Sequence, residues 1–85
     1  MSDEGKKIGV VTHFYDKIGV GIVKLDSEIK IGDKLKFQGN ATDFEQEAEQ
    51  MQFDHKDIET AKKGQEVGIK LSDKVREGDI VYLAS

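Results

Sequence analysis

One short pattern occurs three times in this sequence and restricts the folds that are open to it. In each copy, an apolar residue is followed by two residues, a glycine, a polar residue, one further residue and a second apolar residue, as in residues 29–35, 61–67 and 75–81. The glycine can take a positive φ that side chains resist, and the polar residue after it can hydrogen-bond the backbone of the turn. The leading apolar residue is expected to be held in the core. The pattern therefore predicts three tight turns, each of which enters a β-strand directly.

Short runs of alternating apolar and polar residues support an all-β chain. The runs at 8–15 and 20–25 flank a turn at 16–19, where Gly19 supplies the positive φ, and predict a first hairpin. Three such turns in so short a chain imply about six strands closed into an antiparallel β-barrel. Closure would also remove the sheet edges, which this chain has no proline to protect. The predicted core consists of Ile8, Val10, Val20, Ile22, Leu35, Phe37, Met51, Phe53, Val67, Ile69, Leu71 and Val81.

The middle of the chain admits two interpretations. The apolar face changes phase between Ala48 and Met51, which predicts a continuous strand with a β-bulge near residues 49–50. A helix capped by Asp43 is the alternative, because Phe44, Ala48 and Met51 are spaced as on one helical face. We favour the strand, chiefly because of the family resemblance described below.

Composition excludes several classes of protein. The chain has 85 residues, which we interpret as a flexible amino terminus at 1–6 and one barrel domain at 7–85. The absence of cysteine excludes disulfides, thiolate metal sites and a cysteine nucleophile. Residues 1–7 lack the apolar stretch of a secretory signal, and no apolar run reaches the ~20 residues of a membrane helix. We therefore expect a cytoplasmic protein without membrane contact.

No constellation of residues points to catalysis. His13 and His55 are the conventional metal or acid–base candidates, but a zinc site needs three or four ligands and nothing in their spacing converges. The sequence has no phosphate-binding loop and no Ser/His/Asp order. We expect surface histidines, no metal, no cofactor, no nucleotide binding and no enzymatic activity.

Alternating carboxylates mark the middle strand. They are expected to form a solvated face that also discourages pairing at a sheet edge, and the alternative is a docking surface for a basic partner; the residues are Asp43, Glu45, Glu47 and Glu49.

Six fragments occur in a characteristic order and spacing: IGVVTHF (8–14), VGIVKL (20–25), IGDKL (31–35), MQFDHK (51–56), AKKGQEVGI (61–69) and REGDIV (76–81). Together they resemble the second-domain β-barrel of the translational GTPases, the elongation factor Tu-like proteins, and the resemblance covers about residues 7–84. Similar barrels occur as carboxy-terminal modules of collagenase-like peptidases and as short elongation-factor-like proteins, and this chain looks most like the last group.

The resemblance implies a binding module that contacts tRNA or the ribosome without hydrolysing a nucleotide. A net charge of −4 with a single arginine argues against tight non-specific nucleic-acid binding, but a local patch of lysines with a stacking aromatic could still contact RNA. The alternative is a protein–protein interaction module that uses the acidic strand or an apolar patch. The candidate RNA-binding residues are Lys17, Lys56, Lys62, Lys63, Arg76 and Tyr15.

Overall fold

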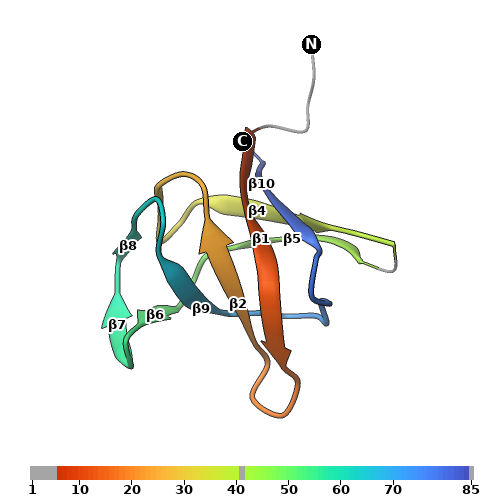
Figure 1. Ribbon diagram of the computed structural model, residues 1–85, viewed down its shortest axis with the longest axis horizontal. Coiled ribbons are helices and arrows are strands. Elements are labelled where there is room, and N and C mark those ends of the chain that lie inside the picture. The colour runs from red at the N-terminus through yellow and green to blue at the C-terminus, as the bar shows by residue number, and fades with distance from the viewer. Residues whose placement is uncertain (1–5, 41, 85) are drawn as a thin grey trace.

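The computed structural model describes residues 6–40 and 42–84, and every regular element within these ranges is a β-strand (Figure 1). The predicted flexible segment at 1–6 lies almost wholly outside the described residues, since the first strand begins at Lys6. The strands are β1 (Lys6–Tyr15), β2 (Val20–Leu25), β3 (Ile29–Lys30), β4 (Lys34–Gln38), β5 (Asp43–Glu47), β6 (Met51–Phe53), β7 (Lys56–Ile58), β8 (Thr60–Ala61), β9 (Glu66–Lys70) and β10 (Ile80–Leu83).

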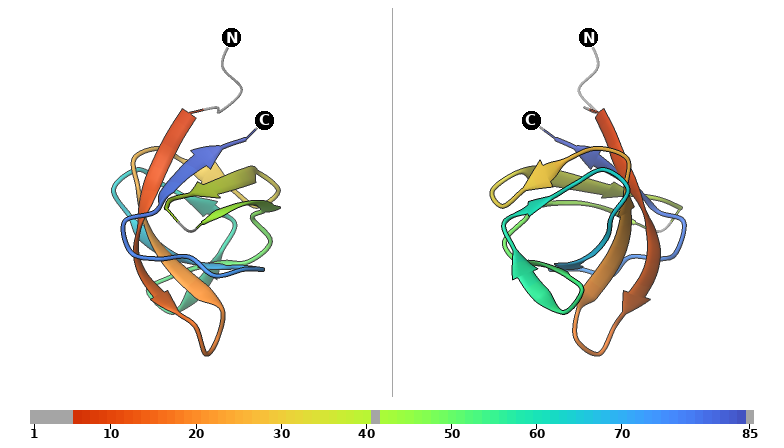
Figure 2. Two further views of the ribbon diagram at one scale, coloured as in Figure 1. Left: turned by 90° about the vertical axis from the view of Figure 1, so that its right-hand side faces the viewer. Right: turned by 60° about the vertical axis from the view of Figure 1, so that its left-hand side comes forward.

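Eight of these strands form one antiparallel sheet that curls around the core as an open half-barrel (Figure 2). Its order is β5-β4-β10-β1-β2-β9-β6-β7, and β3 and β8 pair separately. The all-β prediction is therefore confirmed, but the closed six-stranded barrel is wrong. The sheet stays open because the segment between β5 and β9 divides into short strands and a hairpin, which leaves β5 and β7 as free edges.

The three repeated turns form as predicted. Gly32, Gly64 and Gly78 have φ values of 97°, 90° and 93°, and a strand starts two residues after each glycine. In every copy the side chain that follows the glycine accepts a hydrogen bond from the backbone N–H three residues earlier, at 2.8–2.9 Å. The leading apolar residues Ile29, Ala61 and Val75 are all buried. The same local chemistry thus builds the entries to β4, β9 and β10.

The first hairpin forms as predicted, but two bulges change which side chains of β1 face inward. The register shifts between Lys7 and Gly9 against β10, and between Val11 and His13 against β2. Each bulge moves the inward position by one residue, so Ile8 and Val11 are buried and Phe14 packs against the core. The prediction that Val10 belongs to the core is therefore wrong, because simple alternation does not reveal a bulge.

In β2 and β6, three further core predictions are wrong. Val20 and Ile22 lie half-buried on the outer face of the sheet, while Val23 and Leu25 face the core. The inward position between Val20 and Ile22 is a glycine, and the side chain of Leu71 occupies the space that a Cβ there would need. Phe53, at the end of β6, is 37% exposed.

The buried apolar residues form one cluster that includes eight of the predicted core positions. The members are Ile8, Val11, Val23, Leu25, Ile29, Leu35, Phe37, Ala48, Met51, Ala61, Val67, Ile69, Leu71, Val75 and Val81.

The middle segment forms neither the helix nor one continuous strand. Residues 48–50 separate β5 from β6 and carry the chain from β4 to β9, which changes the partner strand as well as the phase. Buried Ala48 is held there by two backbone hydrogen bonds, from the N–H of Gly32 at 2.9 Å and to the carbonyl of Asp33 at 2.8 Å. The predicted bulge is thus replaced by a break between two strands.

A single side chain links edge strand β5 to the end of β9. The Gln46 amide donates to the carbonyl of Lys70 at 2.7 Å and accepts from the N–H of Ser72 at 2.7 Å. These bonds take the place of a backbone ladder between the two segments.

Candidate functional site

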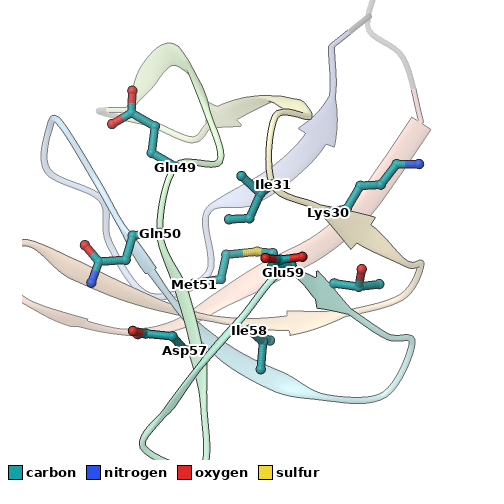
Figure 3. Close-up of a pocket in the computed structure, with 9 residues that line it drawn as sticks. Lys30, Ile31, Glu49, Gln50, Met51, Asp57, Ile58 and Glu59 are labelled. Atoms are coloured by element: carbon teal, nitrogen blue, oxygen red, sulfur yellow. The ribbon is translucent and has the colours of Figure 1, made fainter.

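A groove of about 600 Å³ lies where β3, the β5–β6 connection and the β7–β8 segment meet (Figure 3). This volume falls within the range of roughly 300–1,000 Å³ that ligand sites occupy. The groove is lined by Lys30, Ile31, Glu49, Gln50, Met51, Asp57, Ile58, Glu59 and Thr60.

Two apolar side chains, Ile31 and Ile58, provide the hydrophobic surface of the groove, and Met51 lies between them beneath that surface. Figure 3 shows Met51 between Ile31 above it and Ile58 below it. Met51 is buried in the core, Ile58 is half-buried and Ile31 remains 39% exposed. Ile31 therefore offers apolar area that the isolated chain leaves in contact with water.

Backbone hydrogen bonds hold the walls of the groove in place. The N–H of Ile31 donates to the carbonyl of Glu59 at 2.9 Å, which joins the turn after β3 to the β7–β8 segment. The N–H of the next residue, Gly32, donates to Ala48, which directly precedes Glu49. The groove is thus preorganised by main-chain contacts.

Negative charge predominates around the groove. Its lining includes the carboxylates of Glu49, Asp57 and Glu59 and one ammonium group, that of Lys30. The ion pairs within residues 6–40 and 42–84 are His13–Glu77 at 3.1 Å and Lys34–Glu45 at 3.3 Å, so none of them neutralises a groove carboxylate. Asp57 does accept a hydrogen bond from the amide of Gln52 at 2.9 Å.

A second hollow of about 340 Å³ lies on the outer face of β2, β9 and β6. Its floor contains the cross-strand neighbours Ile22, Gly68 and Gln52. The surface is hollowed at Gly68 because glycine has no side chain to fill the space. Tyr15, which is 49% exposed, and Ile18 lie at its rim.

The candidate RNA-binding residues are all exposed but lie on different parts of the fold. Lys17 is in the turn before β2, whereas Lys62 and Lys63 precede Gly64, whose N–H bonds the carbonyl of Leu25 at the other end of β2. The length of β2 thus separates them by about 20 Å.

The remaining members of this set lie elsewhere. Arg76 lines a third groove, of about 520 Å³, together with Asp16, Phe14 and Phe44. Lys56 opens β7, and Tyr15 borders the outer hollow.

The two histidines lie at the surface. His13 Nδ1 is 3.1 Å from a Glu77 carboxylate oxygen, and its ring centroid is 4.4 Å from that of Tyr15. His55, with a φ of 64°, is in the β6–β7 turn beside the outer hollow. In the part of the chain that the structure describes, no group of three or more His, Cys, Asp or Glu residues is placed to hold a metal ion.

The predicted acidic row lies along edge strand β5 and just beyond it. Asp43, Glu45 and Glu47 project from edge strand β5 and are exposed, as is Glu49 beyond it. Charged side chains on an edge strand oppose pairing with another chain. Glu49 is the member of the row that also lines the 600 Å³ groove.

Sequence reasoning did not identify this groove, although one signal was present. In the three repeated turns, the residue before the glycine is Ile31, Lys63 or Glu77. Two copies have a charged side chain at this exposed position, and only the first has an apolar one. Ile31 was therefore recognisable as an apolar residue at a turn position where the other two copies have a charged, exposed residue.

Comparison with known proteins finds relatives that are named as protease and collagenase. The chain is 47% identical over 78 residues to a Methanocaldococcus jannaschii protein named as an uncharacterized protease, and 30% identical over 77 residues to a collagenase of Porphyromonas gingivalis. These matches cover 91% and 88% of this chain. The chain spans about a fifth of the length of each relative, 19% and 21%. No family model matches the chain.

Solved structures share the fold. The C-terminal domain of a Geobacillus thermoleovorans protein described as a U32 peptidase has a TM-score of 0.88 at 18% identity, covering 94% of this chain and 93% of that domain. The bacterial selenocysteine-specific elongation factor EF-Sec has a TM-score of 0.70 at 20% identity, covering 96% of this chain and 15% of that factor. The resemblance to a translation-factor barrel is thus supported at the level of the fold.

The relatives correct one sequence-based expectation. The prediction of no enzymatic activity is contradicted, because the matched proteins are named protease and collagenase and one structural neighbour is described as a U32 peptidase domain. Residues 6–40 and 42–84 contain no helix with the length and hydropathy that crossing a bilayer requires.

Proposed function

We propose that this chain is the half-barrel module of a peptidase of the U32 kind and that it engages the polypeptide on which the peptidase acts. The observation that carries the proposal is the 47% identity over 78 residues to a segment of a larger protein named as a protease. The fold supports the same assignment, since it matches a U32 peptidase C-terminal domain over nearly the whole length of both chains.

The open groove provides the surface for this role. It combines exposed apolar area at Ile31 with uncompensated carboxylates, and its walls are joined by backbone hydrogen bonds. A surface that is preorganised in this way loses little entropy when a flexible chain binds.

A segment exchange in the Porphyromonas gingivalis collagenase tests the proposal. The matched 77-residue segment is either deleted or replaced by this chain, and cleavage of collagen and of a short synthetic peptide is measured. We expect deletion to abolish collagen cleavage while sparing the short peptide, and replacement to restore collagen cleavage. The matched control carries the EF-Sec barrel, which has the same fold with 20% identity to this chain. A folded chimera no more active on collagen than the deletion variant contradicts the proposal.

A second candidate function is contact with RNA. It is supported by the exposed, paired rings of His13 and Tyr15, which offer a stacking surface for a base, and by the fold shared with EF-Sec. The lysines and arginine would contact phosphates. Titration with tRNA at low and moderate salt tests this candidate, and lack of saturable binding at low salt, where electrostatic attraction is strongest, removes it.

A further inference from the structure

In the turn at residues 29–35, the residue before the glycine is the apolar Ile31, whereas the other two repeated turns have a charged residue at this position. The lysine and glutamate at the equivalent positions 63 and 77 are both exposed. Ile31 remains 39% exposed even though its own backbone is bonded to Glu59. Leaving a branched apolar side chain in water has a free-energy cost that contact with a second molecule would recover.

Charge determines which kind of molecule suits this surface. Three carboxylates and one ammonium group surround the apolar floor, and in Figure 3 Glu49 and Asp57 lie toward one side of Met51 while Lys30 lies toward the other. A ligand with positive charges flanking an apolar side chain would meet both features, because electrostatic complementarity favours the correct partner and suppresses others.

Free backbone groups favour a polypeptide over a small cation. In the β6–β7 hairpin, Phe53 and Lys56 flank the two-residue turn and Gln52 pairs with Asp57. The pair that flanks such a turn is hydrogen-bonded, so the next pair is not, and the N–H and C=O of Asp57 point away from β6. Because β7 is an edge of the sheet, these groups have no partner among the described strands and can bond an extended chain that lies along β7, whose residues Asp57 and Ile58 line the groove.

From this arrangement we infer that the groove binds an extended, basic polypeptide segment. An apolar side chain packs on Ile31 and Ile58, above buried Met51, and lysine or arginine side chains on either side of it contact Glu49 and Glu59. The inference rests on the proposed function only in identifying this segment as part of the peptidase substrate.

Peptide binding to the whole chain tests the inference directly. The probe is a short fluorescein-labelled peptide of alternating lysine and valine, followed by fluorescence anisotropy, with an alternating glutamate and valine peptide as its control. We expect E49Q and E59Q each to weaken binding about threefold, which is the order expected for loss of an exposed ion pair. We expect I31S to weaken it about fivefold through lost apolar burial.

Matched variants outside the groove separate this site from diffuse attraction to an acidic protein. E66Q removes a carboxylate on β9, and I18S removes an exposed apolar side chain in the β1–β2 turn. Both are expected to bind the peptide as the parent chain does. Equal weakening by E66Q and E59Q, or equal binding of the two peptides, overturns the inference. Spermidine that binds as tightly as the peptide and is unaffected by I31S overturns the polypeptide as the occupant.

Amide chemical shifts provide a readout that does not depend on the variants. In the parent chain, addition of the lysine–valine peptide is expected to move the amide signals of Ile31, Met51, Asp57 and Glu59 and to leave that of Ile18 in place. Shifts confined to the outer hollow overturn the assignment.

The collagenase chimera distinguishes failure of this inference from failure of the proposed function. If E49Q and E59Q lose peptide binding but the chimera carrying both still cleaves collagen normally, the groove binds basic peptide as inferred, but its identification as the surface for the peptidase substrate is overturned, while the proposed function stands. If E49Q and E59Q bind the peptide as the parent chain does, the inference itself is overturned. If the unmodified chimera is inactive but the isolated chain binds the peptide as expected, the groove assignment is supported and the proposed function fails.

Discussion

Two of the repeated turns provide a matched pair for measuring what burial adds to one hydrogen bond. Asp33 and Asp79 occupy the same position after a glycine, and each carboxylate accepts from the backbone N–H three residues earlier, at 2.9 and 2.8 Å. Asp79 is only 6% exposed and also accepts from the hydroxyl of buried Thr42, whereas the Asp33 bond is exposed. Replacing each aspartate by alanine removes the same local bond in two different surroundings.

The expected losses differ because water can replace one partner and not the other. Asp33→Ala leaves an exposed N–H that water can bond, so we expect a loss of about 1 kcal/mol in the free energy of unfolding. Asp79→Ala leaves the hydroxyl of Thr42 buried without its acceptor, so the cost is about 3 kcal/mol. A domain of this size shifts its Tm by about 4–8 °C per kcal/mol, which gives about 4–8 °C for Asp33→Ala and 12–24 °C for Asp79→Ala.

Urea denaturation followed by circular dichroism, together with thermal melts, measures both losses. Total stability is about 4–13 kcal/mol for a chain of 85 residues, so at the lower limit Asp79→Ala keeps only about 1 kcal/mol and is partly unfolded before denaturant is added. Asp79→Asn, which keeps the shape and one acceptor oxygen, is therefore measured beside Asp33→Asn. Equal losses for the two positions in both series would refute the argument that burial, rather than the turn itself, makes Asp79 costly to replace.

Three further substitutions test other parts of the fold. Gln46→Ala removes the side chain that joins β5 to the end of β9, so we expect a loss of about 2 kcal/mol in urea denaturation, against no more than 0.5 kcal/mol for exposed Gln38→Ala on β4. Gly32→Ala meets open space but keeps a φ of 97°, so backbone strain alone should lower stability by about 1–2 kcal/mol, and an unchanged Tm would contradict this. Val11→Ala should cost about 2 kcal/mol and Val10→Ala less than 1 kcal/mol, because the bulges of β1 bury the former and leave the latter on the outer face; the reverse order in differential scanning calorimetry would contradict the observed facing.

The accuracy of the sequence-based predictions depended on how local each interaction is. The turns before β4, β9 and β10 were predictable because each is made by one glycine and one side chain acting within four residues. The facing of β1 was not predictable in the same way. Its bulges are defined only against β2 and β10, so the burial of Val11 in place of Val10 depends on residues far away in the chain.

In the candidate groove, too, some features could be predicted from local sequence and others depend on contacts between distant residues. Ile31 could have been noticed as the apolar member of the three turns, and Glu49 was already part of the predicted acidic row. Ile31 and Glu49 lie near Asp57 and Glu59 only because the β6–β7 hairpin turns back beside the turn that follows β3. Residues 43–53 have an apolar phase change that a bulge, a helix or a break can satisfy, and no local interaction selects among them. The break between β5 and β6 forms because the backbone hydrogen bonds of Ala48 to Gly32 and Asp33 hold it in the core.

By itself, the amino-acid sequence determined that this protein is built of β-strands and that three of them begin after the same kind of glycine turn, since alternation and glycine placement act over a few residues. Only the tertiary structure decided that the sheet stays open, that β1 faces inward through Ile8, Val11 and Phe14, and that an acidic groove with an apolar floor forms beside edge strand β7. Those outcomes depend on strand pairing and burial between distant residues, whose free energies are set by partners that no local pattern identifies.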